Sequence, residues 1–214
     1  MNRLIIFDCD STLSSIEGVD ELARSKGEEV FAQVVDLTRQ AMEGEISLES
    51  VFAKRMDLIQ PSKAELTAIG ELYLKTMANG VNEVVSDLIN KGWQLAVISG
   101  GLYPPVAHFA EQLGIKEVCA VPVHLDPDGH YLGFDQDYPS ARSGGKPEIV
   151  RQLQLKYQSK KTVMVGDGVS DLETKPEVDL FVGYGEFEVR EKVKAEADAF
   201  IYSFRELPSV LGQF

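Results

Sequence analysis

Cysteine, histidine and positive charge are all scarce in this chain of 214 residues. It contains two cysteines, three histidines and 21 basic against 34 acidic residues, which gives a formal net charge of −13. Two cysteines are too few for a disulfide framework, and the histidines do not have the spacing of a metal site. The negative charge argues against nucleic acid or an anionic membrane as a partner.

Long apolar runs and a P-loop are missing as well. No stretch approaches the length of a membrane-spanning helix, and the first predicted strand begins too early to leave room for a signal peptide. Without a P-loop, nothing indicates nucleotide-driven chemistry. We therefore expect a cytoplasmic protein. Its hydrophobic fraction of 44% is ample for the core of one domain, or of a core with a modest insertion.

The first chemical signal lies at the start of the chain. Leu4-Ile5-Ile6-Phe7 predicts a short strand buried on both faces, and Asp8-Cys9-Asp10-Ser11-Thr12 follows it. On an extended backbone Asp8 and Asp10 point to one side, and Cys9 points to the other, into packing. Two carboxylates this close repel one another, which a hard cation such as Mg²⁺ would relieve. Taken alone, the motif also fits a surface turn.

Helical periodicity follows this motif. One apolar stripe runs from Val30 to Met42 and another from Leu48 to Ile59, where Pro61 ends it, and the helical pattern continues to residue 78. Arg55 interrupts the second stripe. Since arginine is rarely buried without a partner, this position favours a buried or cleft-facing guanidinium over one that extends to the surface.

From residue 81 onward, helices and strands alternate. The predicted elements are a helix over 81–89, a strand over 94–98, a helix from 104, strands over 119–123 and 130–134 joined by a turn, a helix from 147, a strand over 162–165, and strands over 178–183 and 199–202 around a helix at 188–194. This alternation predicts the α/β class, with a Rossmann-like parallel sheet core and helices on both faces. A small helical-bundle cap, residues 15–79, would be inserted after the first strand into a core of residues 1–14 and 80–214.

Polar motifs coincide with the predicted strand ends, where function gathers in open α/β sheets. Four successive strand ends are predicted to carry Asp8 and Asp10, Ser99-Gly100-Gly101, Lys146 (just before a helix), and Asp167 with Asp171. The carboxylates could hold a divalent cation, while the lysine, the hydroxyl and backbone amides could bind an anion. This combination suits phosphoryl transfer, in which a carboxylate can itself be the nucleophile.

The combined motifs resemble the haloacid dehalogenase superfamily and, within it, the family of phosphoserine phosphatases along most of the chain. The matching motifs are Asp8-Cys9-Asp10-Ser11-Thr12, Ser99-Gly100-Gly101, Lys146 and Gly166-Asp167-Gly168-x-x-Asp171, with further matches at 38–44, 54–55, 133–135, 143–146 and 181–185. The resemblance implies a Mg²⁺-dependent phosphomonoester hydrolase with an aspartyl-phosphate intermediate that converts O-phosphoserine to serine and phosphate.

The resemblance also implies a role for each matched residue. Asp8 would attack phosphorus, and Asp10 would protonate the leaving alkoxide and later activate water. Mg²⁺ would be held by the carboxylates of Asp8 and Asp167 and the backbone carbonyl of Asp10, with Asp171 in support. The implied substrate-binding residues are Ser99, Gly100 and Lys146 for the phosphoryl oxygens, Glu17 for an ammonium, Arg55 for a carboxylate, and Met42 and Ser170 in the pocket.

Several positions depart from the family pattern without touching the nucleophile or the metal set. They are Leu48 and Leu102 where phenylalanine is frequent, Val121-Pro122 where Asn-Arg is usual, and Ser170 where asparagine or threonine is common. These departures concern the substrate, so another small phosphomonoester, such as phosphoethanolamine or a sugar phosphate, stays an alternative. Glu17 and Arg55 favour a substrate with both an amine and a carboxylate.

Two further readings belong to other functional classes. A phosphorylation-sensing receiver module also combines acidic residues, a hydroxyl and a lysine, but it carries its phosphoacceptor on a later strand and lacks a helical insertion. An inactive scaffold is disfavoured because no carboxylate or cation of the set is missing. We expect a monomer or homodimer that acts on a small-molecule phosphate ester.

Overall fold

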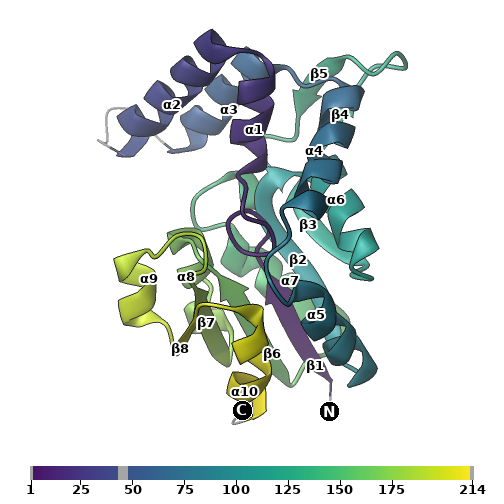
Figure 1. The fold of residues 1–214 in the computed structure, drawn as a ribbon, viewed down its shortest axis with the longest axis vertical. Helices are drawn as coiled ribbons and strands as arrows, with labels where there is room; N and C mark the ends of the chain where they lie inside the picture. The colour runs from purple at the N-terminus through teal and green to yellow at the C-terminus, as the bar shows by residue number, and fades with distance from the viewer. Residues whose placement is uncertain (1, 43–47, 213–214) are drawn as a thin grey trace.

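A six-stranded parallel sheet forms the centre of the computed structural model, which describes residues 2–42 and 48–212 but not the side chains of residues 39, 41, 42, 48 and 49. The strand order is β3-β2-β1-β6-β7-β8 (Figure 1). The strands are β1 (Arg3–Phe7), β2 (Gln94–Leu102), β3 (Glu117–Val121), β6 (Lys161–Gly166), β7 (Leu180–Tyr184) and β8 (Ala199–Ile201). The predicted α/β class with a Rossmann-like parallel sheet is confirmed.

Alternating side chains of β1 contribute to two separate hydrophobic clusters. Ile5 and Phe7 belong to the first cluster, and Leu4 and Ile6 belong to the second. The first includes residues of α5 (Val81–Asn90), α6 (Tyr103–Gln112) and α10 (Leu207–Gly212). The second includes residues of α7 (Lys146–Tyr157), α8 (Val169–Leu172) and α9 (Glu191–Glu196). Helices therefore cover both faces of the sheet, which explains why β1 needs an unbroken apolar run.

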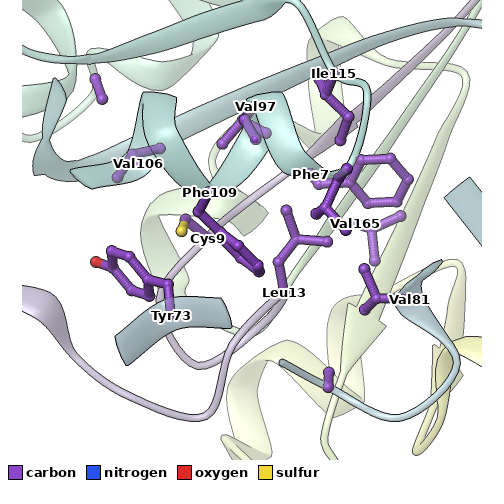
Figure 2. Packing of buried hydrophobic residues seen from close by; sticks show 14 of the residues in the cluster. Phe7, Cys9, Leu13, Tyr73, Val81, Val97, Val106, Phe109, Ile115 and Val165 are labelled. Carbon is purple, nitrogen blue, oxygen red and sulfur yellow. The ribbon is translucent and has the colours of Figure 1, made fainter. Parts of the chain in front are cut away.

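Figure 2 shows the first cluster close to the carboxyl end of β1. Phe7, Val97 and Val165 come from three neighbouring strands and pack in the same cluster as Phe109 of α6. Cys9 is fully buried in this cluster, as its alternation with the two aspartates predicted. Burial, followed by the nearby aspartates, raises the pKa of its thiol well above the ordinary value. The thiol is thus a packing group and not a nucleophile.

Helices α1 (Gly18–Ser25), α2 (Glu28–Met42), α3 (Leu48–Ile59) and α4 (Lys63–Lys75) separate β1 from the rest of the sheet in the sequence. The apolar stripes predicted α2 and α3, and the helical pattern that continues to residue 78 predicted α4, whereas α1 was not predicted. In Figure 1, α1, α2 and α3 lie beyond the carboxyl end of β1, while α4 runs alongside α6. Tyr73 of α4 stacks on Phe109 of α6 with ring centroids 5.6 Å apart, so α4 is packed directly onto a helix that covers the sheet.

A β-hairpin packs against two of the inserted helices, α3 and α4. It consists of β4 (Val123–Leu125) and β5 (Tyr131–Phe134), which pair antiparallel around the predicted turn. The rings of Phe52 in α3 and Phe134 in β5 lie 5.0 Å apart, edge to face. The backbone N–H of Lys63, at the start of α4, donates to the carbonyl of Gly129 in the turn at 2.9 Å. The hairpin thereby fixes the positions of both helices.

Some predicted boundaries are wrong. The single strand predicted over 119–123 is two strands in different sheets, because β3 ends at Val121 and β4 begins at Val123. Pro122 between them lacks the N–H that a continuous ladder needs. Strand β2 continues to Leu102, past the predicted end at 98, and α10 was not predicted. Short 3₁₀ helices occur at Pro139–Ala141, Lys175–Glu177 and Phe204–Glu206. Across the described ranges, every helix is too short or too polar to cross a bilayer.

Candidate active site

The carboxyl ends of β1, β2 and β6 meet at a cavity of about 270 Å³. It is lined by these residues from the predicted set: Asp8, Asp10, Glu17, Arg55, Gly100, Lys146, Asp167, Ser170 and Asp171. Ser99 is fully buried beside the cavity and contacts Asp10. The side chain of Met42 and that of Leu48 lie outside the described residues. A cavity of this size suits a small metabolite.

Lys146 joins two of the carboxylates. Its Nζ donates to Oδ1 of Asp8 at 2.7 Å and to Oδ1 of Asp171 at 2.6 Å, and all three side chains are almost completely buried. Burial alone would lower the pKa of Lys146, but the charges of Asp171 and Asp8 raise it above the ordinary value. The lysine is therefore a fixed positive charge. The predicted strand end before Lys146 is wrong, since Lys146 is the first residue of α7.

Asp167 completes a group of three buried carboxylates. Asp8, Asp167 and Asp171 each bring an oxygen within 4.8 Å of the others. Thr12 Oγ1 donates to Oδ1 of Asp167 at 3.0 Å, and Arg190 Nε donates to Oδ2 at 3.1 Å. Burial, and next the charge of Asp171, raises the pKa of both Asp8 and Asp167. Converging, mutually repelling oxygens of this kind fit a hard divalent cation such as Mg²⁺.

Glycine at the end of β6 lets Asp171 approach the strand. A Cβ on Gly166 would lie 2.4 Å from Cγ of Asp171, which no side chain can tolerate. The backbone N–H of Gly168 also donates to Oδ2 of Asp171 at 2.9 Å. The Gly-Asp-Gly sequence thus places two carboxylates at one strand end, and the flanking glycines are the signal by which the sequence predicted this site.

Asp10 is held through both of its carboxylate oxygens. Oδ1 accepts from the hydroxyl of Tyr73 at 2.6 Å and from the N–H of Gly18 at 2.7 Å. Oδ2 accepts from Ser99 Oγ at 3.1 Å. Burial, and then the charge of Asp10, raises the pKa of Tyr73 well above its ordinary value, so its hydroxyl is a donor. The sequence did not predict Tyr73 as a site residue, because a tyrosine on an apolar helix face is typical of a core.

Glu17 lies where the chain leaves the first motif. Ser11, which has a left-handed φ of 52°, donates from Oγ to Oε1 of Glu17 at 2.7 Å. Burial and the charge of Asp10 raise the pKa of Glu17 to about 8. A cationic group placed against such a carboxyl group stabilises its ionised form. This side of the cavity therefore favours an ammonium group in a ligand.

Arg55 lines the cavity from α3, as its position in the apolar stripe predicted. Its guanidinium forms an ion pair with Asp20 of α1. The side chain is only 17% exposed, and among the described residues its buried Nε has no hydrogen-bond partner. A buried guanidinium with a free donor is suited to bind a planar anion such as a carboxylate. The sequence did not identify Asp20 as its partner.

Further side chains line the cavity that the sequence did not predict. They are Val19, Phe52, Ser140, Arg142, Glu173 and Arg190, while Gly101 and Gly168, which also line the cavity, belong to the predicted motifs. Arg142 and Arg190 bring positive charge to a chain with a net charge of −13. Each is an isolated basic residue in a loop, so no spacing or periodicity could have marked it.

Comparison with known proteins agrees with this geometry. A model of the haloacid dehalogenase-like hydrolase family matches residues 2–174. Phosphoserine phosphatase from Bos taurus is 38% identical over 211 residues, which cover 98% of this chain and 93% of the relative. Phosphoserine phosphatase from Methanocaldococcus jannaschii is 32% identical over 187 residues, which cover 85% of each chain.

Solved structures agree as well. A phospho-aspartyl intermediate analogue of phosphoserine phosphatase has a TM-score of 0.81 at 28% identity, over 98% of both chains. A phosphoserine phosphohydrolase-like protein from Francisella tularensis has a TM-score of 0.82 at 27% identity, over 99% of this chain and 100% of that one. Sequence motifs, fold and relatives thus coincide over nearly the whole chain, which belongs to the haloacid dehalogenase-like hydrolase family.

Proposed function

We propose that this protein is a Mg²⁺-dependent phosphomonoester hydrolase that converts O-phosphoserine to serine and phosphate. The observation that carries the proposal is one small cavity lined by groups for all three charged parts of this substrate. Lys146 and the strand-end amides suit a phosphoryl group, Glu17 suits an ammonium, and Arg55 suits a carboxylate. The relatives named phosphoserine phosphatase support this choice of substrate.

Asp8 is the proposed nucleophile. Its carboxylate oxygen forms a bond to phosphorus as the bond between phosphorus and the serine oxygen breaks, and Asp10 gives its proton to the departing alkoxide. Water then attacks the phosphorus of the aspartyl phosphate, Asp10 takes a proton from it, and Asp8 and phosphate are released. Lys146, 2.7 Å from Asp8, together with Ser99 and Gly100, offers positive charge and hydrogen bonds to the phosphoryl oxygens.

The residues that would hold Mg²⁺ are Asp8 and Asp167, through their carboxylates, and Asp10, through its backbone carbonyl, with Asp171 in support. When bound, the metal supplies positive charge that offsets the repulsion between these acids and the phosphoryl group. The raised pKa values of Asp8 and Asp167, caused by burial and by Asp171, fit this assignment, because a cation among the oxygens would favour their ionised forms.

The amino-acid part of the substrate distinguishes this proposal from its alternatives. Phosphoethanolamine lacks the carboxylate, so Arg55 would face the cavity with no anion to bind. A sugar phosphate lacks both charged groups, which would leave the buried carboxyl of Glu17 without a cation as well. Met42 and Ser170 remain proposed pocket residues. The match to the family pattern supports Met42, and the place of Ser170 in the cavity lining supports Ser170.

The wider setting of the enzyme is also part of the proposal. Residues 15–79 would act as a cap over a core of residues 1–14 and 80–214, with the cap supplying Glu17 and Arg55. The unpaired cysteines Cys9 and Cys119 support a reducing, cytoplasmic location. The partner is a small phosphate ester and neither nucleic acid nor a membrane, and the enzyme would act as a monomer or homodimer.

A panel of phosphate esters tests the proposal. O-phosphoserine, phosphoethanolamine, glucose 6-phosphate and 4-nitrophenyl phosphate are each incubated with the protein and Mg²⁺, and released phosphate is followed over many turnovers. We expect the highest kcat/KM for O-phosphoserine. An equal or higher value for phosphoethanolamine would contradict the role of Arg55, and the release of no more than one phosphate per protein would favour a receiver module.

A further inference from the structure

Tyr73 places its hydroxyl on the candidate acid of the reaction. The side chain is fully buried, and its hydroxyl lies 2.6 Å from Oδ1 of Asp10, although 63 residues separate the two in the sequence. A buried phenol normally needs a hydrogen-bond partner. Here the partner is a carboxylate that lines the cavity, and not the backbone group that a tyrosine with a purely structural role could use.

The ring of Tyr73 is held by the core of the protein. It stacks on Phe109 of α6 at a centroid distance of 5.6 Å and an interplanar angle of 17°, and Figure 2 shows both rings in the cluster close to Cys9. A second contact joins the same two helices, because Oε1 of Glu71 in α4 lies 2.8 Å from Nε2 of His108 in α6. The position of the hydroxyl is therefore set by the contact between α4 and α6.

Space for this hydroxyl depends on the glycine at position 18. A Cβ on Gly18 would lie 2.1 Å from the hydroxyl oxygen of Tyr73, so any larger residue would displace it. The N–H of Gly18 also donates to Oδ1 of Asp10 at 2.7 Å. Two donors, one from α4 and one from the start of α1, thus converge on the same carboxylate oxygen.

The second oxygen of Asp10 has different surroundings. Oδ2 accepts from Ser99 Oγ at 3.1 Å, and it lies 2.9 Å from where a Cβ on Gly101, a residue of the cavity wall, would stand. With Oδ1 engaged by two donors, Oδ2 is the oxygen available to pass a proton to a leaving group in the cavity.

We propose that Tyr73 is a positioning residue that, with Gly18, fixes the carboxyl group of Asp10 so that Oδ2 serves as the proton-transferring oxygen. This inference rests on the proposed phosphomonoesterase function. It assigns to α4 a part in the chemistry that is separate from substrate binding by Glu17 and Arg55. Loss of the Tyr73 hydroxyl frees Asp10 to rotate, while Asp8, Asp167 and Lys146 keep their own hydrogen-bond partners.

The leaving group distinguishes positioning of the acid from general support of the fold. A serine alkoxide is strongly basic and needs a proton as it departs, whereas 4-nitrophenolate leaves readily without one. The ratio kcat/KM covers the steps up to the first irreversible release of the alcohol, so it excludes the later hydrolysis of the aspartyl phosphate, in which Asp10 also acts. A misplaced acid therefore lowers kcat/KM for the alkyl ester alone.

The test compares the Tyr73→Phe variant with the parent on O-phosphoserine and on 4-nitrophenyl phosphate, both with Mg²⁺. Phenylalanine keeps the stack on Phe109 and removes only the hydroxyl. We expect kcat/KM for O-phosphoserine to fall about tenfold or more, and kcat/KM for 4-nitrophenyl phosphate to stay within about twofold. Tyr184→Phe is the matched control, since Tyr184 is equally buried and donates to Glu186 away from the cavity. It should change neither value.

Gly18→Ala is a second variant, which removes no buried ring and should show the same selective loss of kcat/KM for O-phosphoserine. Thermal unfolding verifies that each variant is folded. Equal losses on both esters, or no loss on O-phosphoserine, would overturn the role of Tyr73 while leaving the parent's activity as support for the proposed function. If the parent turns over neither ester, the proposed function fails and the assignment of Tyr73 fails with it.

Discussion

Lys146 Nζ lies 2.7 Å from Oδ1 of Asp8, with 7% of the lysine side chain and 8% of the aspartate side chain exposed. Desolvation, followed by the charge of Asp171, raises the pKa of Asp8 and works against the ionised form that a nucleophile needs. Lys146 opposes this effect. Lys146 therefore favours the ionised form of the nucleophile and holds its carboxylate in place, and removing either partner would leave the other as an uncompensated buried charge.

The Asp8→Asn variant should lose all turnover and keep its fold. Asparagine has nearly the same shape and keeps an oxygen for Lys146, but it cannot form an acyl phosphate. Phosphate release and thermal unfolding measure the two outcomes, and Asp128→Asn on the exposed hairpin turn is the control. In the parent, a reaction with O-phosphoserine labelled at phosphorus and quenched during turnover should leave label on Asp8 as a base-labile acyl phosphate. Full turnover with no label trapped on Asp8 would contradict a covalent step.

Removal of divalent metal should abolish activity, and Mg²⁺ should restore it. One oxygen each of Asp8, Asp167 and Asp171 lies within 4.8 Å of the others. A site with so few carboxylates suits Mg²⁺, which keeps several waters, better than Ca²⁺, which takes more oxygen ligands. Titration of chelated protein with each ion, scored by phosphate release, measures this. Asp167→Asn should raise the Mg²⁺ concentration that gives half-maximal activity. Full activity in excess chelator would rule out a metal requirement.

Local patterns were enough to predict most of the fold. The apolar run of β1 and the glycines that flank Asp167 specify where strands end, and strand ends in parallel sheets come together. The positions of α2 and α3 along the chain followed from their apolar stripes. Pro122 shows the limit of such patterns, since it divides a continuous apolar stretch between two sheets. Its effect depends on which strands are available as neighbours, and no local pattern gives that information.

Partners within the site were harder to predict than the site itself. Asp8 and Asp10 stand out because like charges adjoin a buried strand, whereas Tyr73 and Asp20 occupy ordinary positions on helices. Their roles come from tertiary contacts over 63 and 35 residues of sequence. A pairing of this kind depends on how two helices meet, so the sequence of one helix does not contain it.

The N-terminus of α4 should give the protein a specific loss of stability in acid. Ser62 and Glu65 form a capping box, and Lys26 at the end of α1 lies 2.6 Å from Oε1 of Glu65. Burial acts to raise the pKa of Glu65, but the hydrogen bonds from Lys26 and Ser62 outweigh it and lower the pKa below the ordinary 4.5. Because the pKa of Glu65 is lower in the folded than in the unfolded protein, its ionised carboxylate stabilises the fold at pH values above the unfolded-state pKa. This stabilisation is lost as the pH falls through the folded-state pKa.

Glu65→Gln should therefore destabilise the fold at pH 7 by about 0.5–1 kcal/mol, because the ion pair with Lys26 is partly exposed. The difference from the parent should shrink as the pH falls below 4.5, the ordinary pKa of this side chain. Urea unfolding at several pH values measures it. Glu83→Gln, on the exposed face of α5, controls for loss of a surface carboxylate. A difference that stays constant from pH 7 to pH 3 would mean that charge on Glu65 does not matter.

Arg55 should determine selectivity and not the phosphoryl chemistry. Its guanidinium forms an ion pair with Asp20, and its side chain lines the cavity. A hydrogen bond to a charged group contributes roughly 1.5–3 kcal/mol, so its loss should lower kcat/KM about ten- to a hundredfold. Arg55→Ala should show this loss with O-phosphoserine and hydrolyse 4-nitrophenyl phosphate, which lacks both amine and carboxylate, nearly as well as the parent.

Two variants separate binding of the carboxylate from support of the inserted helices. Arg24→Ala removes an arginine that is 55% exposed on α1, and it should leave both substrates unaffected. Asp20→Asn keeps the arginine but weakens its anchor, so it should raise KM for O-phosphoserine less than Arg55→Ala does. If Arg55→Ala impairs both esters equally, the guanidinium supports the cavity or the phosphate instead. The preference for an amino-acid substrate would then have to come from Glu17 alone, and phosphoethanolamine would become the better candidate.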